Sequence, residues 1–214
     1  MKFFTLIISL LLLSSNIFAK PMSVKEKKER FRSIVVPAVN KVYSDLETQY
    51  IEVLHDMSRS HKYYRKNIEK MKKLYKVSTD EELLKRLKPH PRSIAIAQAA
   101  MESAWATSRF CKEANNIFGV WSSNPNEPRI AAGEQRGTKT IWLRKYNNIE
   151  ESIRDYYKTL AKGKAYKAFR ELKMKTDNPY ELVKKLDKYS ELGAKYGEEL
   201  TEVIKYNKFY LYDK

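Results

Sequence analysis

The sequence predicts a mainly α-helical protein that carries one small β-hairpin. Glycine and proline number only 6 and 7 among 214 residues, whereas lysine and glutamate are abundant, and this composition favours helices over sheets. Apolar residues recur at three- and four-residue steps over most of the chain, as they do in amphipathic helices. One segment, residues 129–146, instead has two short strand-like runs beside two glycines, a pattern typical of a hairpin.

The first 19 residues have the pattern of a cleaved signal peptide. Lys2 supplies the positive start, residues 3–13 form an apolar run, and small and polar residues lead to Ala19. The run is shorter than the ~20 residues that a membrane-spanning helix needs, which disfavours the alternative of a permanent anchor. We therefore expect export to the periplasm or the cell envelope, and no stable membrane span after cleavage.

Residues 20–88 form a predicted helical N-terminal extension. Its apolar residues trace one helix face: Phe31, Ile34, Val35, Ala38, Val42, Leu46, Tyr50, Val53 and Leu54. Pro37 interrupts this face, which predicts a kink or a division into two helices. A further helix is expected to begin at Ser78 or Thr79, because a glutamate follows each of them three residues later, as in a capping box.

The prolines at positions 89 and 91 mark a predicted boundary between the extension and a main domain, residues 89–214. Neither proline extends a helix. The next segment, residues 93–112, is apolar on every side and predicts one buried helix. Asn115 and Asn116 are expected to end it, since asparagine tolerates the left-handed conformation found at helix C-termini.

The predicted hairpin and the helices after it complete the main domain. Residues 129–132 and 138–145 are the expected strands, and Gly133 and Gly137 are expected to bracket the turn.

From residue 147 the helical pattern returns. Asn147 or Asn148 is the expected cap of the first helix, the pair Asn178-Pro179 begins another, and residues 198–208 form the last.

Glu102 is the predicted catalytic residue on physical grounds. It is expected in the middle of the buried helix, between Met101 and Trp105. A buried carboxylate without a partner is costly, and the group responds by raising its pKa. A carboxylic acid that holds its proton near neutral pH can donate it to a leaving group. The competing interpretation is a structural glutamate paired with Arg109 or Arg144.

Residues 97–121 carry a resemblance to a known family. Their sequence, AQAAMESAWATSRFCKEANNIFGVW, resembles the signature of the bacterial glucosaminidases of the flagellar-rod and autolysin type, and is most similar to the Bax-like branch. The resemblance covers residues 91–160 well and continues weakly to the C-terminus. Ala106 departs from it, because the family usually has glycine there. The resemblance implies a lysozyme-like helical domain with a small β-hairpin lobe, preceded by a helical extension.

The resemblance also implies an activity. It is hydrolysis of the β-1,4 bond between N-acetylglucosamine and N-acetylmuramic acid in peptidoglycan, with Glu102 as the general acid. Glu134, expected at the hairpin turn, would be the second carboxylate, with Glu127 as runner-up and an ordinary exposed turn glutamate as the alternative. The two carboxyls lie about 5 Å apart in retaining glycosidases and about 6.5–9.5 Å apart in inverting ones. The acetamido group of the substrate is a third option, and the sequence does not choose among them.

Further site residues follow from the resemblance. Tyr189 is the expected tyrosine beside the reacting sugar, although the acidic stretch that follows it in the family is not reproduced here. The expected substrate-contacting residues are Gln98, Asn116, Phe118, Trp121 and Tyr196. Aromatic faces suit sugars, and Trp121 follows a glycine turn. Trp105 is instead expected in the core, and Trp142 could lie on either face of the hairpin.

The formal net charge of +16 predicts attraction to polyanions. For an exported protein, anionic envelope polymers fit better than nucleic acid, which we do not expect as a partner. Two further alternatives to the hydrolase are a lytic transglycosylase, which would leave an anhydro product, and a non-catalytic protein that binds or assembles cell-wall glycan.

The single cysteine, Cys111, cannot form an internal disulfide and is expected to be a small buried thiol. The three histidines show no metal-ligand spacing. We therefore expect no metal and no organic cofactor.

Overall fold

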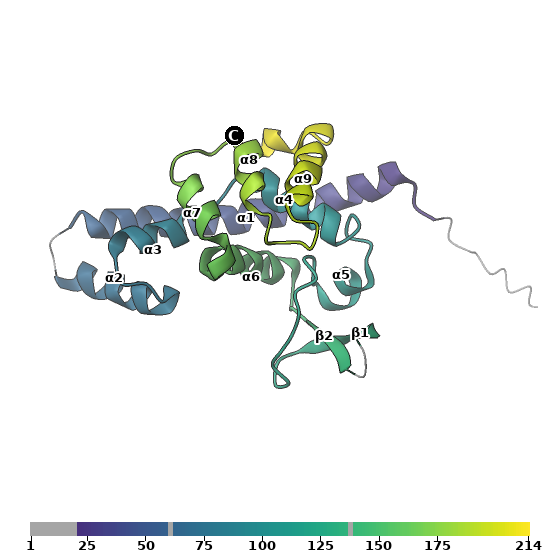
Figure 1. Ribbon diagram of the computed structural model, residues 1–214, viewed down its shortest axis with the longest axis horizontal. Helices are drawn as coiled ribbons and strands as arrows, with labels where there is room; N and C mark the ends of the chain where they lie inside the picture. The colour runs from purple at the N-terminus through teal and green to yellow at the C-terminus, as the bar shows by residue number, and fades with distance from the viewer. Residues whose placement is uncertain (1–20, 60–61, 137–138) are drawn as a thin grey trace, which may run out of the picture.

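Helices dominate the computed structural model, which describes residues 21–59, 62–136 and 139–214 (Figure 1). The elements in chain order are α1 (Val24–Met57), α2 (Lys62–Tyr75), α3 (Asp80–Leu87), α4 (Arg92–Glu102), α5 (Arg109–Ala114), β1 (Arg129–Arg136), β2 (Lys139–Arg144), α6 (Ile149–Lys162), η1 (Lys164–Tyr166), α7 (Lys167–Lys173), α8 (Pro179–Leu182), η2 (Val183–Lys185), α9 (Ala194–Tyr206) and η3 (Phe209–Asp213). The predicted lysozyme-like organisation, mainly helical with a small hairpin lobe, is confirmed. The expected signal peptide lies outside the described residues. Within them, no helix is long and apolar enough to cross a membrane.

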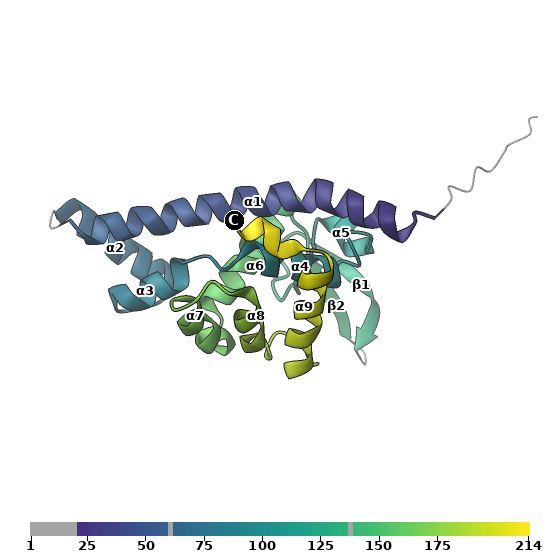
Figure 2. The same cartoon turned by 90° about the horizontal axis from the view of Figure 1, so that it is seen from above.

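Helix α1 runs along one side of the molecule as a single element of 34 residues (Figure 2). Ser23 and Glu26 form a reciprocal capping box at its start, in which each side chain accepts a hydrogen bond from the backbone of the other. The expected division into two helices at Pro37 is wrong. Proline leaves the carbonyl of Ser33 without its helical partner, but both residues lie on the exposed face, where water can replace that bond.

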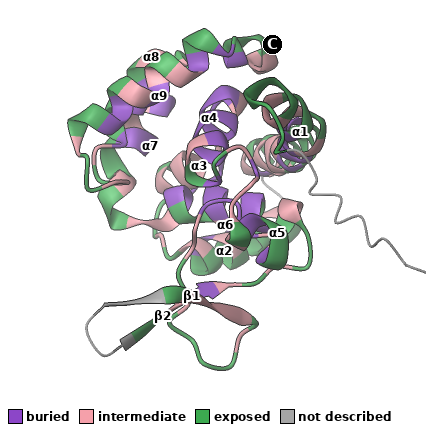
Figure 3. Cartoon of the chain, turned by 90° about the vertical axis from the view of Figure 1, so that its right-hand side faces the viewer, coloured by how far each residue is buried: buried purple, intermediate pink, exposed green. Residues whose placement is uncertain are grey.

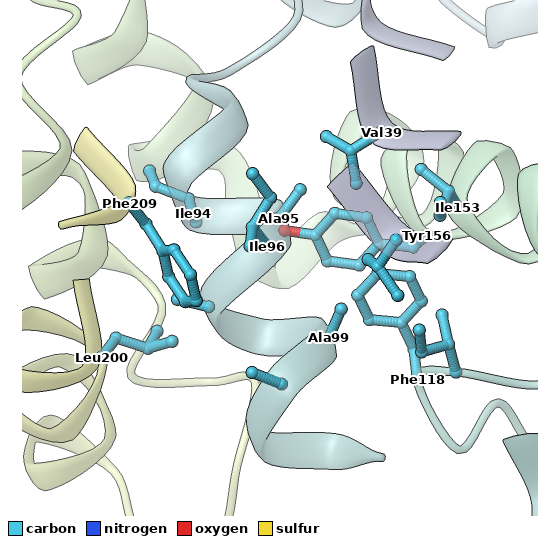
Figure 4. Packing of buried hydrophobic residues seen from close by; sticks show 14 of the residues in the cluster. Val39, Ile94, Ala95, Ile96, Ala99, Phe118, Ile153, Tyr156, Leu200 and Phe209 are labelled. Atoms are coloured by element: carbon cyan, nitrogen blue, oxygen red, sulfur yellow. The ribbon is translucent and has the colours of Figure 1, made fainter. Parts of the chain in front are cut away.

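The first half of α1 belongs to the main core. Phe31, Val35, Val39 and Val42 are completely buried in the same cluster as α4 and α6, part of which is shown in Figure 4. A second, smaller cluster joins the end of α1 to α2 and α3, through Val53, Ile68, Leu83 and Leu87. The first half of α1, although it lies before the boundary expected after residue 88, therefore supplies side chains to the core of the main domain.

Helix α4 occupies the centre of the main core. Every residue from Ser93 to Ala100 is buried, as predicted, and the helix lies between α1, α6 and α9 (Figure 3). The single helix expected over residues 93–112 is instead interrupted after Glu102. Three consecutive residues, 104–106, have positive φ angles of 49°, 63° and 58°, and the chain turns before α5 begins at Arg109. Asn115 ends α5 in the left-handed conformation, with φ 51°, as predicted.

Strands β1 and β2 form an antiparallel hairpin that projects from the helical body (Figures 1 and 3). The register is regular except between Ala131 and Gln135, where β1 contains an irregularity around Gly133, whose φ is 85°. Glycine in the left-handed region is a common feature of β-bulges. The expected turn between Gly133 and Gly137 is therefore wrong: β1 continues to Arg136, and the connection lies between Arg136 and Lys139.

The C-terminal helices follow the predicted caps. Asn148 caps α6, and Asn178 with Pro179 begins α8. The last helix starts at Ala194, four residues earlier than expected, directly after Gly193 with a φ of 59°. Helix α9 packs against α4 (Figure 2).

Candidate active site

Glu102 is the last residue of α4, so its expected position in the middle of a buried helix is wrong. Its side chain is exposed on one side, while its Oε1 accepts a hydrogen bond of 2.8 Å from the hydroxyl of Tyr196. The surrounding protein removes part of the hydration of the carboxyl group and raises the pKa of Glu102, and the hydrogen bond from Tyr196 acts in the opposite direction. The carboxyl thus combines access to a ligand with a raised affinity for its proton.

Neither predicted arginine neutralises Glu102. Arg109 pairs with Glu113 at 3.1 Å, and Arg144 pairs with Asp155 at 2.8 Å. Among the described residues Glu102 has no ion pair, and Tyr196 is its hydrogen-bond partner. The structural interpretation of Glu102 as half of a buried salt bridge is therefore wrong.

A chain of buried hydrogen bonds leads from Glu102 into the core. Gln98 Nε2 donates to the hydroxyl oxygen of Tyr196 at 3.0 Å, and the hydroxyl of Tyr156 donates to Gln98 Oε1 at 2.6 Å. His90 Nε2 lies 3.0 Å from the hydroxyl oxygen of Tyr156. Because the Tyr156 proton is directed at Gln98, His90 Nε2 must be the donor in this network. Burial lowers the pKa of His90, which keeps the imidazole neutral.

Every donor in this chain therefore points toward Glu102. The proton of Tyr196 is directed at Oε1, so the acidic proton of Glu102 is favoured on Oε2, the oxygen left for a ligand. Sequence reasoning missed Tyr156 and His90. Tyr156 lies in the helical pattern that returns after residue 147, and His90 lies between the two prolines of the predicted boundary. The pairing of these residues across 66 positions has no local signal.

Two of the predicted substrate contacts are inaccessible. Gln98 is 0% exposed, and its amide instead orients Tyr196. Asn116 is also buried, and its amide donates to the carbonyls of Val120 and Arg144, both at 2.9 Å. The predicted direct contact of these side chains with a ligand is therefore wrong, because Gln98 is already hydrogen-bonded within the buried chain and Asn116 holds the turn after α5 and the end of β2.

The aromatic residues near Glu102 form two stacked pairs. Phe118 is buried and lies parallel to Tyr156, with ring centroids 4.1 Å apart. Tyr196 is also buried, and its ring stacks on Tyr189 at 5.4 Å. Phe118 and Tyr196, which were both predicted to contact the substrate, thus lie beneath the surface and support the residues above them. Tyr189 is half-buried, and burial together with the charge of Glu102 raises the pKa of its hydroxyl, which stays neutral.

The second carboxylate remains a prediction. Glu134 lies inside β1, within the irregular stretch between Ala131 and Gln135, and not at the turn where we expected it. Its side chain is outside what the structure describes. Glu127, the runner-up, is held in an ion pair with Arg144 at 3.2 Å, which favours a structural role at the base of the hairpin.

The three tryptophans differ in environment. Trp121 is 58% exposed at the base of the hairpin, where its backbone bridges to Leu143, and it remains the predicted sugar platform. Trp105 packs edge-on against Phe31 at 5.2 Å, as expected for a core residue. Trp142 is half-buried under the guanidinium of Arg129.

The left-handed turn after Glu102 is held by Ser103, whose hydroxyl donates to the carbonyl of Ala99 and accepts from the amide of Ala106. A left-handed conformation costs a non-glycine residue roughly 1–2 kcal/mol. At Ala106 a buried methyl group offsets this cost. Ala104 is exposed, so its methyl group offers no such compensation.

We expect Ala104→Gly to stabilise the protein by about 0.5–1 kcal/mol, because relief of the left-handed strain exceeds the extra chain entropy that glycine loses on folding. Urea unfolding measures this difference. Ala168→Gly, at an exposed position in the first turn of α7, is the control and should destabilise the protein, because its φ is not in the left-handed region and no strain is relieved. If both variants lost the same free energy of unfolding, the strain at Ala104 would be contradicted.

Comparison with known proteins identifies the family. The model of the glucosaminidase family, described as mannosyl-glycoprotein endo-β-N-acetylglucosaminidase, matches residues 77–209, which is more than half of the chain. The chain belongs to the glucosaminidase family. The match begins ahead of α3, so the glucosaminidase region includes part of the segment that we assigned to the extension.

Individual relatives of this glucosaminidase are distant. Protein bax of Escherichia coli K12 is 29% identical over 124 residues, which are 55% of this chain and 43% of that protein, so the chain matches less than half the length of this relative. Similar solved structures include the catalytic domain of the autolysin Auto from Listeria monocytogenes, with 20% identity, a TM-score of 0.47 and coverage of 90% of this chain and 98% of the other. They also include the glycoside hydrolase domain of FlgJ from Salmonella typhimurium, with 22% identity, a TM-score of 0.45 and coverage of 67% and 87%.

Proposed function

We propose that this glucosaminidase hydrolyses peptidoglycan at the β-1,4 bond between N-acetylglucosamine and N-acetylmuramic acid, with Glu102 as the general acid. The observation that carries the proposal is the state of one carboxyl group. Glu102 is accessible, its pKa is raised, and a directional hydrogen bond occupies Oε1 and leaves Oε2 for the substrate. These are the properties that a proton donor to a glycosidic oxygen requires.

In the proposed reaction, Glu102 Oε2 transfers its proton to the glycosidic oxygen as the bond from that oxygen to the anomeric carbon breaks. Positive charge develops on the sugar, and the Glu102 carboxylate that forms is stabilised by the hydrogen bond from Tyr196. Water then adds to the anomeric carbon. The proton of that water passes to a base: Glu134 in a direct displacement, or the regenerated Glu102 carboxylate if the acetamido group of the substrate first forms the intermediate.

Export and wall binding complete the proposal. The signal-like first 19 residues support delivery to the periplasm or cell envelope, and the charge of +16 supports retention on anionic envelope polymers. Binding to purified cell walls should then weaken as salt is added, since exposed charges are screened. Wall binding that does not change with salt would exclude the electrostatic contribution.

The decisive experiment is digestion of purified peptidoglycan by the chain without residues 1–19, followed by mass spectrometry of the fragments. New reducing N-acetylglucosamine ends would establish the proposed bond specificity. Anhydro-muramic ends would assign the protein to the transglycosylases. Intact glycan strands that nevertheless bind the protein would leave it a wall-binding protein.

Tyr196→Phe should move the basic limb of the pH–activity profile to higher pH. The hydroxyl of Tyr196 lowers the pKa of Glu102 by stabilising the carboxylate, so its removal raises that pKa further. Glu102 must be protonated to act, and the variant therefore stays active at a pH where the wild type has lost activity. Initial rates across the pH range test this. Tyr166→Phe, at a tyrosine without direct contact to Glu102, should leave the limb in place. A shift to lower pH in Tyr196→Phe would refute the assigned hydrogen bond.

A further inference from the structure

A cavity of about 260 Å³ lies between the N-terminal helices α1–α3 and the helices α6 and α7. It is enclosed by sixteen residues, and six of them are Lys or Arg, whereas none is Asp or Glu. The six are Arg86, Lys88, Arg154, Lys158, Lys162 and Lys173. Such an accumulation of one sign of charge, in a recess with low-dielectric walls, creates a strong positive potential.

Only two of these six cations are neutralised by an acidic side chain. Lys88 pairs with Asp177 at 2.9 Å and Arg154 with Asp45 at 2.7 Å. The remaining four have no carboxylate within 4.0 Å among the described residues. Ion pairs with acidic side chains therefore do not cancel the positive charge of the cavity.

Arg86 lines this cavity and has one unused donor. Its Nη1 donates to the carbonyls of Ala161 and Lys162, at 3.0 and 3.1 Å, at the C-terminus of α6. This end of the helix carries partial negative charge and fixes the guanidinium. The Nε–H on the same group is buried and has no hydrogen-bond partner within the described part of the chain. A buried donor without a partner is costly, and a bound acceptor would remove that cost.

Two lysines of the cavity donate hydrogen bonds to backbone carbonyl oxygens and have no carboxylate partner among the described residues. Lys162 Nζ donates to the carbonyl of Leu74 at 2.7 Å, and Lys173 Nζ donates to the carbonyl of Lys88. Lys173 is almost completely buried, and its pKa is lowered to about 7 by burial and by the charges of Arg170 and Lys88. The fold thus brings several basic side chains together here, although burial removes part of their hydration.

Much of the remaining lining of the cavity is apolar. Leu74 and Leu87 come from α2 and α3, and the rings of Tyr75 and Tyr157 come from α2 and α6. A fully hydrated inorganic ion would leave these surfaces unused. The volume lies below the about 300–1,000 Å³ of typical small-molecule sites, which restricts the ligand to a small one.

We propose that this cavity binds a small organic phosphate, whose phosphoryl oxygens accept from the guanidinium of Arg86 and from Lys162 and whose organic part lies on the apolar part of the lining. A phosphate monoester carries close to two negative charges, which matches Arg86, Lys158 and Lys162, together with Lys173 in its protonated form, better than a single carboxylate does. Glu102 does not line this cavity, whereas His90, at the far end of its hydrogen-bond chain, does. The cavity is formed where the N-terminal helices meet the main domain, so a ligand bound there would join the two clusters of buried residues.

The test uses glycerol 3-phosphate as the probe, with the chain from residue 20 onward, in isothermal titration and in thermal unfolding. Saturable binding of one equivalent with a rise in unfolding temperature is the expected result. Inorganic phosphate should bind more weakly, because it cannot use the apolar walls. Equal affinity for inorganic phosphate would refute the organic part of the proposal, and no saturable binding at millimolar probe would refute the site.

Variants locate the binding. Arg86→Gln and, as a second variant, Lys162→Gln should each weaken binding by about tenfold or more, the effect of losing one charge-assisted hydrogen bond. Lys167→Gln removes one positive charge from the surface of α7 outside the cavity and should leave the affinity unchanged. An equal loss in all three would show general attraction to a basic surface and would overturn the proposal.

The same titration distinguishes the source of the phosphate. Competition by vesicles of phosphatidylglycerol would identify a lipid headgroup as the ligand, whereas binding of glycerol 3-phosphate that such vesicles do not displace would identify a free phosphate ester. Because neither readout uses peptidoglycan cleavage, the result is independent of the proposed enzymatic activity.

Discussion

Glu102→Gln is expected to lower the rate of peptidoglycan cleavage by about 10²–10⁴-fold, the contribution that a general acid makes to a proton transfer. Glutamine has the size of glutamate and its Oε1 can still accept the hydrogen bond from Tyr196. It has no proton of suitable acidity to give to the glycosidic oxygen, so the loss should appear in kcat while wall binding is retained. Initial rates on purified peptidoglycan measure the effect.

The stability of the same variant separates catalysis from folding. The pKa of Glu102 is raised in the folded state, so the folded protein loses stability as the pH rises from the ordinary pKa of glutamate through this raised value. Glutamine does not ionise and has no such loss. Glu102→Gln should therefore be at least as stable as the wild type at neutral pH. Glu113→Gln, at an exposed glutamate paired with Arg109, should keep full activity. Activity that survives in Glu102→Gln would refute the assignment.

Phe31→Ala should destabilise the whole molecule by about 3–5 kcal/mol, as expected for deletion of a fully buried phenyl ring. Phe31 lies in α1, yet its ring contacts Trp105 and Phe209 at centroid distances of 5.2 and 6.4 Å. The loss should therefore appear in the main cooperative transition on urea unfolding, and not in a separate transition of the N-terminal helices.

Ile51→Ala is the matched control on the same helix. Ile51 is 58% exposed, so its truncation should cost much less than that of Phe31. If α1 were an appendage outside the main core, Phe31→Ala would leave the unfolding of the remaining protein unchanged. That outcome would contradict the shared cluster of buried residues, and deletion of residues 20–57 would then yield a folded domain.

The local elements were predictable because their signals lie within a few residues of one another. The caps at Thr79, Asn148 and Asn178 each use a side chain that accepts a hydrogen bond from a backbone amide two or three positions later. The apolar face of α6 and the buried surface of α4 follow from periodicity alone. The helix end at Asn115 likewise depends on one residue type.

The errors share a different cause. The interruption after Glu102 depends on Ser103 holding a left-handed turn that is packed against α1 through Trp105, and no propensity scale marks it. The continuity of α1 through Pro37 depends on which face of the helix meets solvent. In both cases tertiary contacts outweigh a local preference of about 1–3 kcal/mol.

By itself, the sequence determined the mainly helical fold and the family resemblance, and it pointed to Glu102 as the proton donor that we propose. Only the tertiary structure decided how that carboxyl is prepared for chemistry. It placed Glu102 at an exposed helix end and joined it, through Tyr196, Gln98 and Tyr156, to a buried chain of donors. The physical reason is that pKa and proton position depend on burial and on hydrogen-bond partners, and the partner of Glu102 lies 94 positions away along the chain.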